Sequence, residues 1–233
     1  TQYNYKNNKF MLGLHDSGNH TGLFGESKDE VQTIAATMIN NNTPLNHFAF
    51  ISGIMKEKDT LLGSKHSGAI GINGSNPTSY FNGINIAHSI TDTISFRANT
   101  ILGRTIIGDP NHSLIDSFSP ISSSSFEFSF HKSSVFNKND NVSLTLSQPN
   151  RIENGSMNFK IQDLADRNGS INYRLKKINL EPSGRQIDFG IKYMNKINEN
   201  FKFGIKNTIT KDANHIKKSD LNHTITAITS ITF

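Results

Sequence analysis

The sequence predicts an all-β protein, and three observations indicate more narrowly a single closed antiparallel up-and-down transmembrane β-barrel of about 12 strands. The first is strict alternation of apolar and polar side chains, clearest in residues 186–193, 201–206 and 221–233. Successive side chains of a strand point to opposite faces, so a period of two indicates strands. The second is a hydrophobic fraction of only 34%, below the roughly 45–50% of soluble domains. The third is that short and long connections tend to alternate, as in membrane barrels.

The N-terminal part allows two interpretations. Residues 9–15 alternate and predict a first strand. Residues 27–30 have the form of a helix capping box, and apolar residues follow at helical spacing. The same region, residues 33–39, also reads as a strand, which we favour because every other segment is one. The helix or strand state of residues 27–39, and the number of strands in residues 1–45, stay open at this point.

Strand-like alternation recurs through the middle of the chain, in residues 45–56, 80–90, 93–106, 126–131 and 142–146. Residues 67–72 are expected to pair with residues 45–56. Residues 157–161 and 172–180 predict two more strands about a loop, between Asn-Gly and Pro-containing turn signals. Most of these segments reach or approach the roughly 9–11 residues that a tilted strand needs to cross a bilayer.

Composition and motifs exclude several classes of function. The formal net charge is +5, but Lys and Arg are scattered rather than clustered with aromatic residues, so no nucleic-acid partner is expected. The chain has no cysteine, which removes thiol catalysis and Cys-based zinc sites. No nucleophile elbow or metal-binding His motif occurs, so we expect no catalytic residue, metal or cofactor, and no enzyme activity. The first residues lack a signal peptide. An exported protein would therefore carry further sequence before residue 1.

Two short motifs, Gln-Pro-x-Arg and Pro-Ser-Gly-Arg, are the most specific features of the chain. From about residue 57 onward the sequence resembles the C-terminal barrel domain of subtilisin-like serine protease autotransporters of Gram-negative bacteria. The matching residues are Glu57, Leu62, Gly63, Gln148, Pro149, Arg151, Gly155, Pro182, Gly184 and Arg185, with Phe233 at the end. Asn150 departs from the pattern, because such domains more often carry leucine there.

That resemblance implies a translocator in the bacterial outer membrane, which anchors an N-terminal passenger and helps to export it to the cell surface. The passenger would be a subtilisin-like protease, whose catalytic motifs are absent from this chain. The implied partners are outer-membrane lipid, the barrel-assembly machinery and the passenger itself. Terminal Phe233 resembles the signal that the machinery reads, although an ordinary closing strand would also end in this way.

Seven charged residues are candidates for the lining of a lumen. A charge that faces lipid near the midplane costs ~2–4 kcal/mol for Arg or Lys, so alternation is expected to turn these side chains inward. They are Arg97, Arg104, Glu127, Arg151, Arg185, Asp188 and Lys202. Such a lining would let an unfolded passenger slide and would pair with a plug segment. Alternatively, the Arg and Asp or Glu side chains would simply satisfy one another across the lumen, and the two interpretations are not exclusive.

Two other functions remain compatible with the sequence. One is a passenger-less porin or adhesin-like barrel in the outer membrane. The other is a soluble β-rich binding domain, in which the same alternation would form half of a sandwich. The sequence leaves the oligomeric state and a possible plug undetermined.

Overall fold

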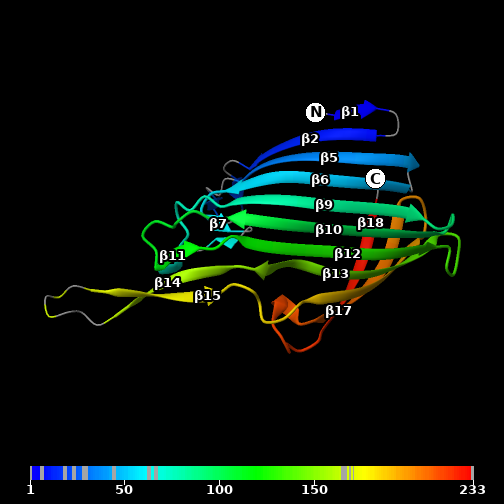
Figure 1. Cartoon of the computed structure of the whole chain (residues 1–233). Helices are drawn as coiled ribbons and strands as arrows, with labels where there is room; N and C mark the ends of the chain where they lie inside the picture. The colour runs from blue at the N-terminus through cyan, green and yellow to red at the C-terminus, as the bar shows by residue number, and fades with distance from the viewer. Residues whose placement is uncertain are drawn as a thin grey trace.

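The computed structural model describes residues 2–5, 8–17, 20–22, 25–27, 31–43, 46–61, 64–65, 68–163, 167, 169 and 171–231. Within these residues the protein is all-β, and eleven antiparallel strands form one sheet in the order β1-β2-β5-β6-β9-β10-β12-β13-β16-β17-β18 (Figure 1). Their bounds are β1 Gln2–Tyr5, β2 Asn8–Ser17, β5 Val31–Thr43, β6 Asn46–Glu57, β9 Thr78–Ser89, β10 Ile94–Ile106, β12 Ile121–Ser133, β13 Asp140–Asn154, β16 Ile187–Lys196, β17 Phe201–Lys211 and β18 Asn222–Ile231.

Smaller elements flank the main sheet. A three-stranded sheet contains β11 (Ile115–Phe118), β14 (Ser156–Gln162) and β15 (Tyr173–Asn179). Two short pairs are β3 (His20–Gly22) with β4 (Gly25–Ser27), and β7 (Thr60–Leu61) with β8 (Ser64–Lys65). Two 3₁₀ turns, η1 (Gly68–Ile70) and η2 (Ala213–His215), complete the described elements.

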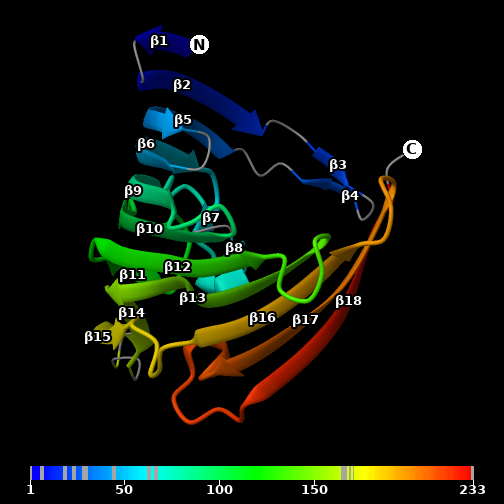
Figure 2. The same ribbon diagram turned by 90° about the vertical axis from the view of Figure 1, so that its right-hand side faces the viewer.

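The main sheet curls but does not close. Figure 2 shows β16, β17 and β18 swinging away from the plane of the earlier strands to form the second wall of a trough. In the described part of the chain, β1 and β18 are the two edges of the sheet and do not pair with each other. The structure therefore shows an open eleven-stranded sheet where the sequence predicted a closed barrel of about 12 strands. Alternation specifies the face of each side chain, whereas closure depends on the tilt and stagger of all strands together.

Three sequence predictions about individual segments were tested by the strand pairing. Residues 33–39 lie in β5, whose Ile34 and Met38 face Ile54 and Phe50 of β6, so the strand interpretation is confirmed and the helix is excluded. The predicted pairing of residues 67–72 with 45–56 was wrong, because β6 pairs with β9 and η1 occupies residues 68–70. Residues 157–161 and 172–180 are strands, but they pair with each other and β11 outside the main sheet.

The two ends of the strands differ. At one end, the turn end, short turns join β9 to β10, β12 to β13 and β16 to β17. At the other, the loop end, longer segments join β6 to β9, β10 to β12, β13 to β16 and β17 to β18. The β12–β13 turn is held by Asp140, whose carboxylate accepts hydrogen bonds from the backbone N–H groups of Val135 (2.7 Å), Phe136 (3.0 Å) and Asn137 (3.1 Å).

The buried apolar core of the described residues lies mostly at the loop end, between the main sheet and the three-stranded sheet. Ile72, Ile107, Ile115 and Ile121 are all at most 7% exposed there. A cavity of about 200 Å³ lies beside them and is lined by Leu61, Ile70, Ile72, Ile115, Phe118, Met157 and Leu180. Away from the loop end, the described strands of the main sheet form a single layer (Figures 1 and 2).

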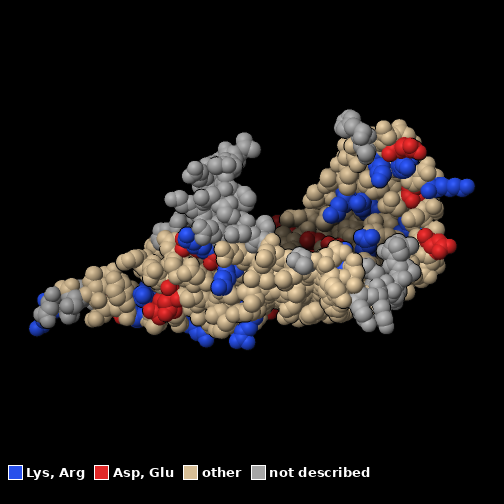
Figure 3. Space-filling view, turned by 90° about the horizontal axis from the view of Figure 1, so that it is seen from above, with Lys and Arg blue, Asp and Glu red and all other residues tan. Residues whose placement is uncertain are grey.

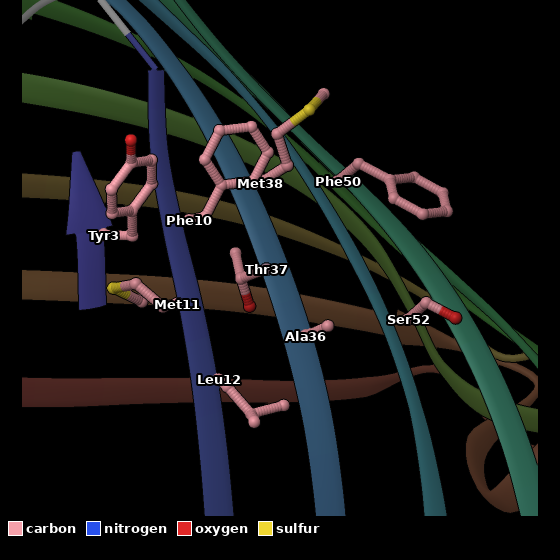
Figure 4. Close-up of a pocket in the computed structure, with 9 residues that line it drawn as sticks. All are labelled: Tyr3, Phe10, Met11, Leu12, Ala36, Thr37, Met38, Phe50 and Ser52. Carbon is pink, nitrogen blue, oxygen red and sulfur yellow. The ribbon is translucent and has the colours of Figure 1, made fainter. Parts of the chain in front are cut away.

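One face of the main sheet carries large apolar side chains that are exposed, and we call this surface the apolar band. The strand register places them side by side across the sheet, as in the row Phe128, Leu146, Phe189 and Ile209. Figure 4 shows part of the band near the β1 edge, with Phe10, Met38 and Phe50 on neighbouring strands. Its members are Phe10, Leu12, Leu14, Ile34, Met38, Phe48, Phe50, Ile54, Tyr80, Ile84, Ile86, Leu102, Phe128, Phe130, Leu144, Leu146, Phe189, Ile191, Phe203, Ile205, Ile209, Ile225 and Ile231, each 37–75% exposed.

Candidate functional site

The opposite face of the main sheet, here called the polar face, is the sheltered one. In β9 the side chains of this face are buried or half-buried, whereas most of those on the apolar band are exposed. Because the sheet is a single layer, crowding on one face and exposure on the other indicate that the polar face lines the inside of the curl. Figure 3 shows the hollow that results, with Lys and Arg atoms gathered on the wall of β16–β18 and acidic atoms deeper in it.

Four of the seven charged residues predicted to line a lumen lie on the polar face. Arg97 is in register with Ser129 of β12, and Glu127 follows two positions along on the same face. Glu127 is in register with Ser147, which pairs with Asp188 of β16. Lys202 of β17 faces Lys196. The structure therefore gathers these four side chains from β10, β12, β16 and β17 onto one surface.

Arg104 lies on the other face. It pairs with Tyr80 of β9, a member of the apolar band, and is seven positions from Arg97 on an unbroken strand, so the two side chains point to opposite sides. Arg104 is near the loop end of β10, where the strand ends at Ile106.

Hydrogen bonds order much of the polar face. Asp188 accepts a bond of 2.6 Å from the Thr210 hydroxyl and two from the Gln186 amide, at 3.0 and 3.1 Å. The His131 ring lies 2.7 Å from the Ser143 hydroxyl and 3.1 Å from that of Ser129. These contacts fix the acidic and imidazole groups of the wall in place.

Sequence reasoning missed three lysines that share the polar face with Lys202. Lys192 lies directly opposite Lys206, and Lys196 directly opposite Lys202, across β16 and β17. The signal was present in the sequence, because Lys192 and Lys196 occupy the same alternate positions as Asp188. Only the register between β16 and β17 shows that the lysines of the two strands face each other.

Arg151 and Arg185, the remaining two candidates, belong to an ionic cluster at the loop end. Arg151 is only 6% exposed. Its guanidinium donates to Glu153 Oε2 (2.6 Å), to Glu181 Oε1 (3.1 Å) and to three backbone carbonyls, including those of Gly184 (2.9 Å) and Pro182 (3.0 Å). Every donor direction of this fork is therefore used inside the protein.

Arg185 completes the cluster from the other side of Glu153. Its guanidinium donates to Glu153 Oε1 at 2.9 Å and Oε2 at 2.6 Å, and also to the side-chain oxygen of Gln148, which is 2% exposed. The Gln148 amide donates in turn to the Ser124 carbonyl, at 3.1 Å. The acidic partners Glu153 and Glu181 lie outside both motifs, and sequence reasoning missed them.

Glu153 lies beyond Leu146, the last residue that β13 contributes to the apolar band. Burial alone would raise the pKa of its carboxyl. Hydrogen bonds from Arg185 and Ser124 and the charges of Arg185 and Arg151 outweigh burial and lower that pKa to about 2. Glu153 is therefore ionised at every ordinary pH, and the two arginines share one fixed negative charge.

The local sequence explains why the two motif stretches meet. The register between β12 and β13 slips between Gln148 and Arg151, forming a bulge that contains Pro149. Proline has no backbone N–H to donate, so it suits a bulge rather than a regular ladder position. His215 then bridges the stretches: its Nδ1 accepts from the Gln186 N–H (3.0 Å), so Nε2 carries the proton and donates to the Asn150 carbonyl (3.1 Å).

Gly184 sits where no larger residue fits, because a Cβ atom there would lie 2.5 Å from the backbone nitrogen of Lys217. Gly155 is tight against Ile121, with 3.0 Å between its ideal Cβ position and Ile121 Cγ1. Glu57, 3% exposed, accepts a hydrogen bond from the Thr60 hydroxyl at 3.3 Å. Leu62, Gly63 and the terminal Phe233 lie outside the described residues.

Neither a metal centre nor a membrane-spanning helix is found in the described ranges. No group of three or more His, Asp or Glu side chains there is placed to hold a metal ion. Among the same residues, no helix is long and apolar enough to cross a membrane.

Comparison with known proteins adds no relative. The chain matches no protein-family model, and neither the curated proteins nor the solved structures contain a significant match.

Proposed function

We propose that this chain is the membrane-embedded wall of an outer-membrane translocator, which anchors an N-terminal passenger and helps to export it. The observation that carries the proposal is the division of one single-layered sheet into an exposed apolar band and a sheltered polar face. Soluble proteins rarely expose so many large apolar side chains in one continuous surface. Lipid against the band and water against the polar face would satisfy both sides of the sheet.

Strand length supports the same environment. Ten of the eleven strands of the main sheet, all except β1, have 10–15 residues. A tilted strand needs about 9–11 residues to cross the hydrocarbon core. Each strand of the main sheet other than the four-residue β1 is therefore long enough to span a bilayer.

Closure is part of the proposal. An unpaired strand edge in hydrocarbon leaves backbone N–H and C=O groups without partners, at a cost of several kcal/mol each. We therefore propose that the β1 and β18 edges pair in the membrane, so that the curled sheet closes into a barrel. Ten successive antiparallel pairings separate β1 from β18, so these two strands run in the same direction and the closing pair is parallel, unlike the all-antiparallel barrel that the sequence predicted. The role in passenger export rests on the resemblance carried by the Gln148–Arg151 and Pro182–Arg185 motifs, which meet in one cluster.

The membrane proposal is tested by expressing residues 1–233 behind an export signal and fractionating the cells. We expect the protein in the outer-membrane fraction, extraction only by detergent, and a change in gel migration on heating. A monomer that is soluble in buffer would refute the proposal and favour the soluble binding domain.

Closure has its own test, because the chain has no native cysteine to interfere. Asn4→Cys is combined in turn with Thr224→Cys, Thr226→Cys and Ile228→Cys, and disulfide formation is measured in membranes. Paired strands bring Cα atoms within the roughly 4.4–6.8 Å that a disulfide needs, so at least one pair should cross-link within the monomer. Asn4→Cys with Ser89→Cys is the matched control and should not cross-link.

Export is tested by joining a reporter domain before residue 1. A translocator brings the reporter to the cell surface, where added protease removes it. A barrel that is correctly inserted while the reporter stays protected would indicate a passenger-less porin or adhesin-like barrel instead.

A further inference from the structure

We infer that the polar face forms a path that prefers small inorganic anions, such as chloride, over cations, and that the four lysines of β16 and β17 set this preference. The inference rests on the proposed function, because a path through the membrane exists only where the sheet encloses a lumen.

The arrangement of the lysines is the first support. Lys192 faces Lys206, and Lys196 faces Lys202, as direct cross-strand pairs. Side chains in such pairs start only about 4.5–5.5 Å apart, and like charges at these positions destabilise a sheet. Two such pairs on one face favour a ligand that compensates them, and that ligand must be negative.

The second support is the shortage of negative charge beside them. Asp188 is the acidic residue that β16 and β17 contribute to this face, and Thr210 and Gln186 already donate hydrogen bonds to it. No described carboxylate forms an ion pair with any of the four lysines. A positive field in a narrow hollow with low-dielectric walls concentrates anions.

The rest of the polar face does not reverse this field. Arg97 and Lys9 add positive charge, and the register places both on the polar face. Glu127 is the acidic residue that faces the hollow from β12. Glu57 shares the face by register but is 3% exposed and lies at the end of β6.

Spacing along the strands favours passage over tight binding. The two lysine pairs are four residues apart on each strand, or roughly 13 Å at the rise of a β-strand. Gly204 lies between the two pairs, opposite Met194, whose side chain covers it. Gly190 lies beyond the Lys192–Lys206 pair, and Lys206 extends over it, with its Cε 3.6 Å from where a Cβ would be. Weak sites repeated along a path allow an ion to enter and to leave, which is what conduction requires.

The test is a planar-bilayer recording of residues 1–233, refolded in detergent and inserted into neutral phosphatidylcholine under a KCl gradient. We expect a reversal potential of the sign given by chloride permeation. Replacing the four lysines (Lys192→Gln, Lys196→Gln, Lys202→Gln and Lys206→Gln) should abolish the preference and move the potential to zero or beyond. If that variant does not show heat-modifiable migration, Lys192→Gln with Lys206→Gln is recorded instead and should give a smaller shift in the same direction.

A matched control removes four lysines from other positions, in Lys132→Gln, Lys138→Gln, Lys217→Gln and Lys218→Gln. Lys132 lies on the apolar-band side of β12, and the other three lie in turns, so the reversal potential should not move. A wild-type potential of zero or of cation sign would overturn the inference. So would a detergent-extracted, heat-modifiable protein that opens no conductance, which leaves the proposed function intact. If the protein is soluble in buffer without detergent, both the proposed function and this inference are contradicted.

Discussion

Replacing Arg151 by alanine tests whether the ionic cluster holds the loop end together. The guanidinium is 6% exposed and donates to two carboxylates and three carbonyls. Removing one partner of a buried ion pair typically costs ~3–5 kcal/mol. Glu153 keeps Arg185 as a partner, and Glu181 is 43% exposed and can be rehydrated. We therefore expect the lower end, a loss of about 3 kcal/mol in the free energy of unfolding.

The assay is a urea titration of the protein folded in lipid vesicles, followed by circular dichroism and by heat-modifiable migration. Arg174→Ala is the matched control, because that arginine is 68% exposed and lies 3.8 Å from Asp163. Exposed pairs contribute about 0–1 kcal/mol, so the midpoint of the control should hardly move. A loss of less than about 1 kcal/mol in Arg151→Ala would refute the reasoning, since it would mean that water replaces the cluster without penalty.

Three further predictions concern other parts of the sheet. The pKa of Glu153 is lowered to about 2, so the stabilisation by its carboxylate is complete above the ordinary carboxyl pKa of 4.5 and is lost as the pH falls through 2. Urea titrations between pH 7 and pH 2 should show this loss of stability, and Glu153→Gln should make the stability depend less on pH. Asp140→Asn should lower the urea midpoint in the same titration, because hydrogen bonds to a charged acceptor are the stronger ones. An unchanged midpoint would show that the β12–β13 turn holds without the carboxylate. Leu102→Arg, on the apolar band, should destabilise the lipid-folded protein by ~2–4 kcal/mol. Asn99→Arg, on the polar face of the same strand, should have little effect on its stability. Equal losses of stability in the two variants would contradict the assignment of the faces.

The alternation in the sequence was sufficient to predict the local structure of most strands. Phe126, Phe128 and Phe130 alternate with polar residues, and they do lie along β12 with Phe128 and Phe130 exposed on one face. The period of two settled residues 33–39 as a strand, because Ile34 and Met38 find apolar partners across β6. These are properties of neighbouring residues, which a single sequence displays directly.

Properties that join distant residues were harder to predict. Arg104 and Arg151 were both grouped with Arg97 because all three are charged, yet the structure separates them onto another face and into a cluster. The register slip at the Pro149 bulge places Arg151 opposite Ser124, and no local sequence pattern predicts this slip. The lysine pairs of β16 and β17 likewise depend on a register that only the folded sheet supplies.

The concentration of most of the buried apolar core at the loop end has a mechanical consequence for the proposed membrane wall. Bilayers differ in thickness, and a protein adapts through tilt or through local deformation of the lipid, at fractions of a kcal/mol per Å of mismatch. The packed loop end is a compact block that resists such adjustment, whereas in the proposed membrane setting the strands toward the turn end would have only lipid against their outer surface. In thin or thick membranes the strain should therefore fall on the turn end, and substitutions there should become sensitive to acyl-chain length before those around Ile72 or Ile121.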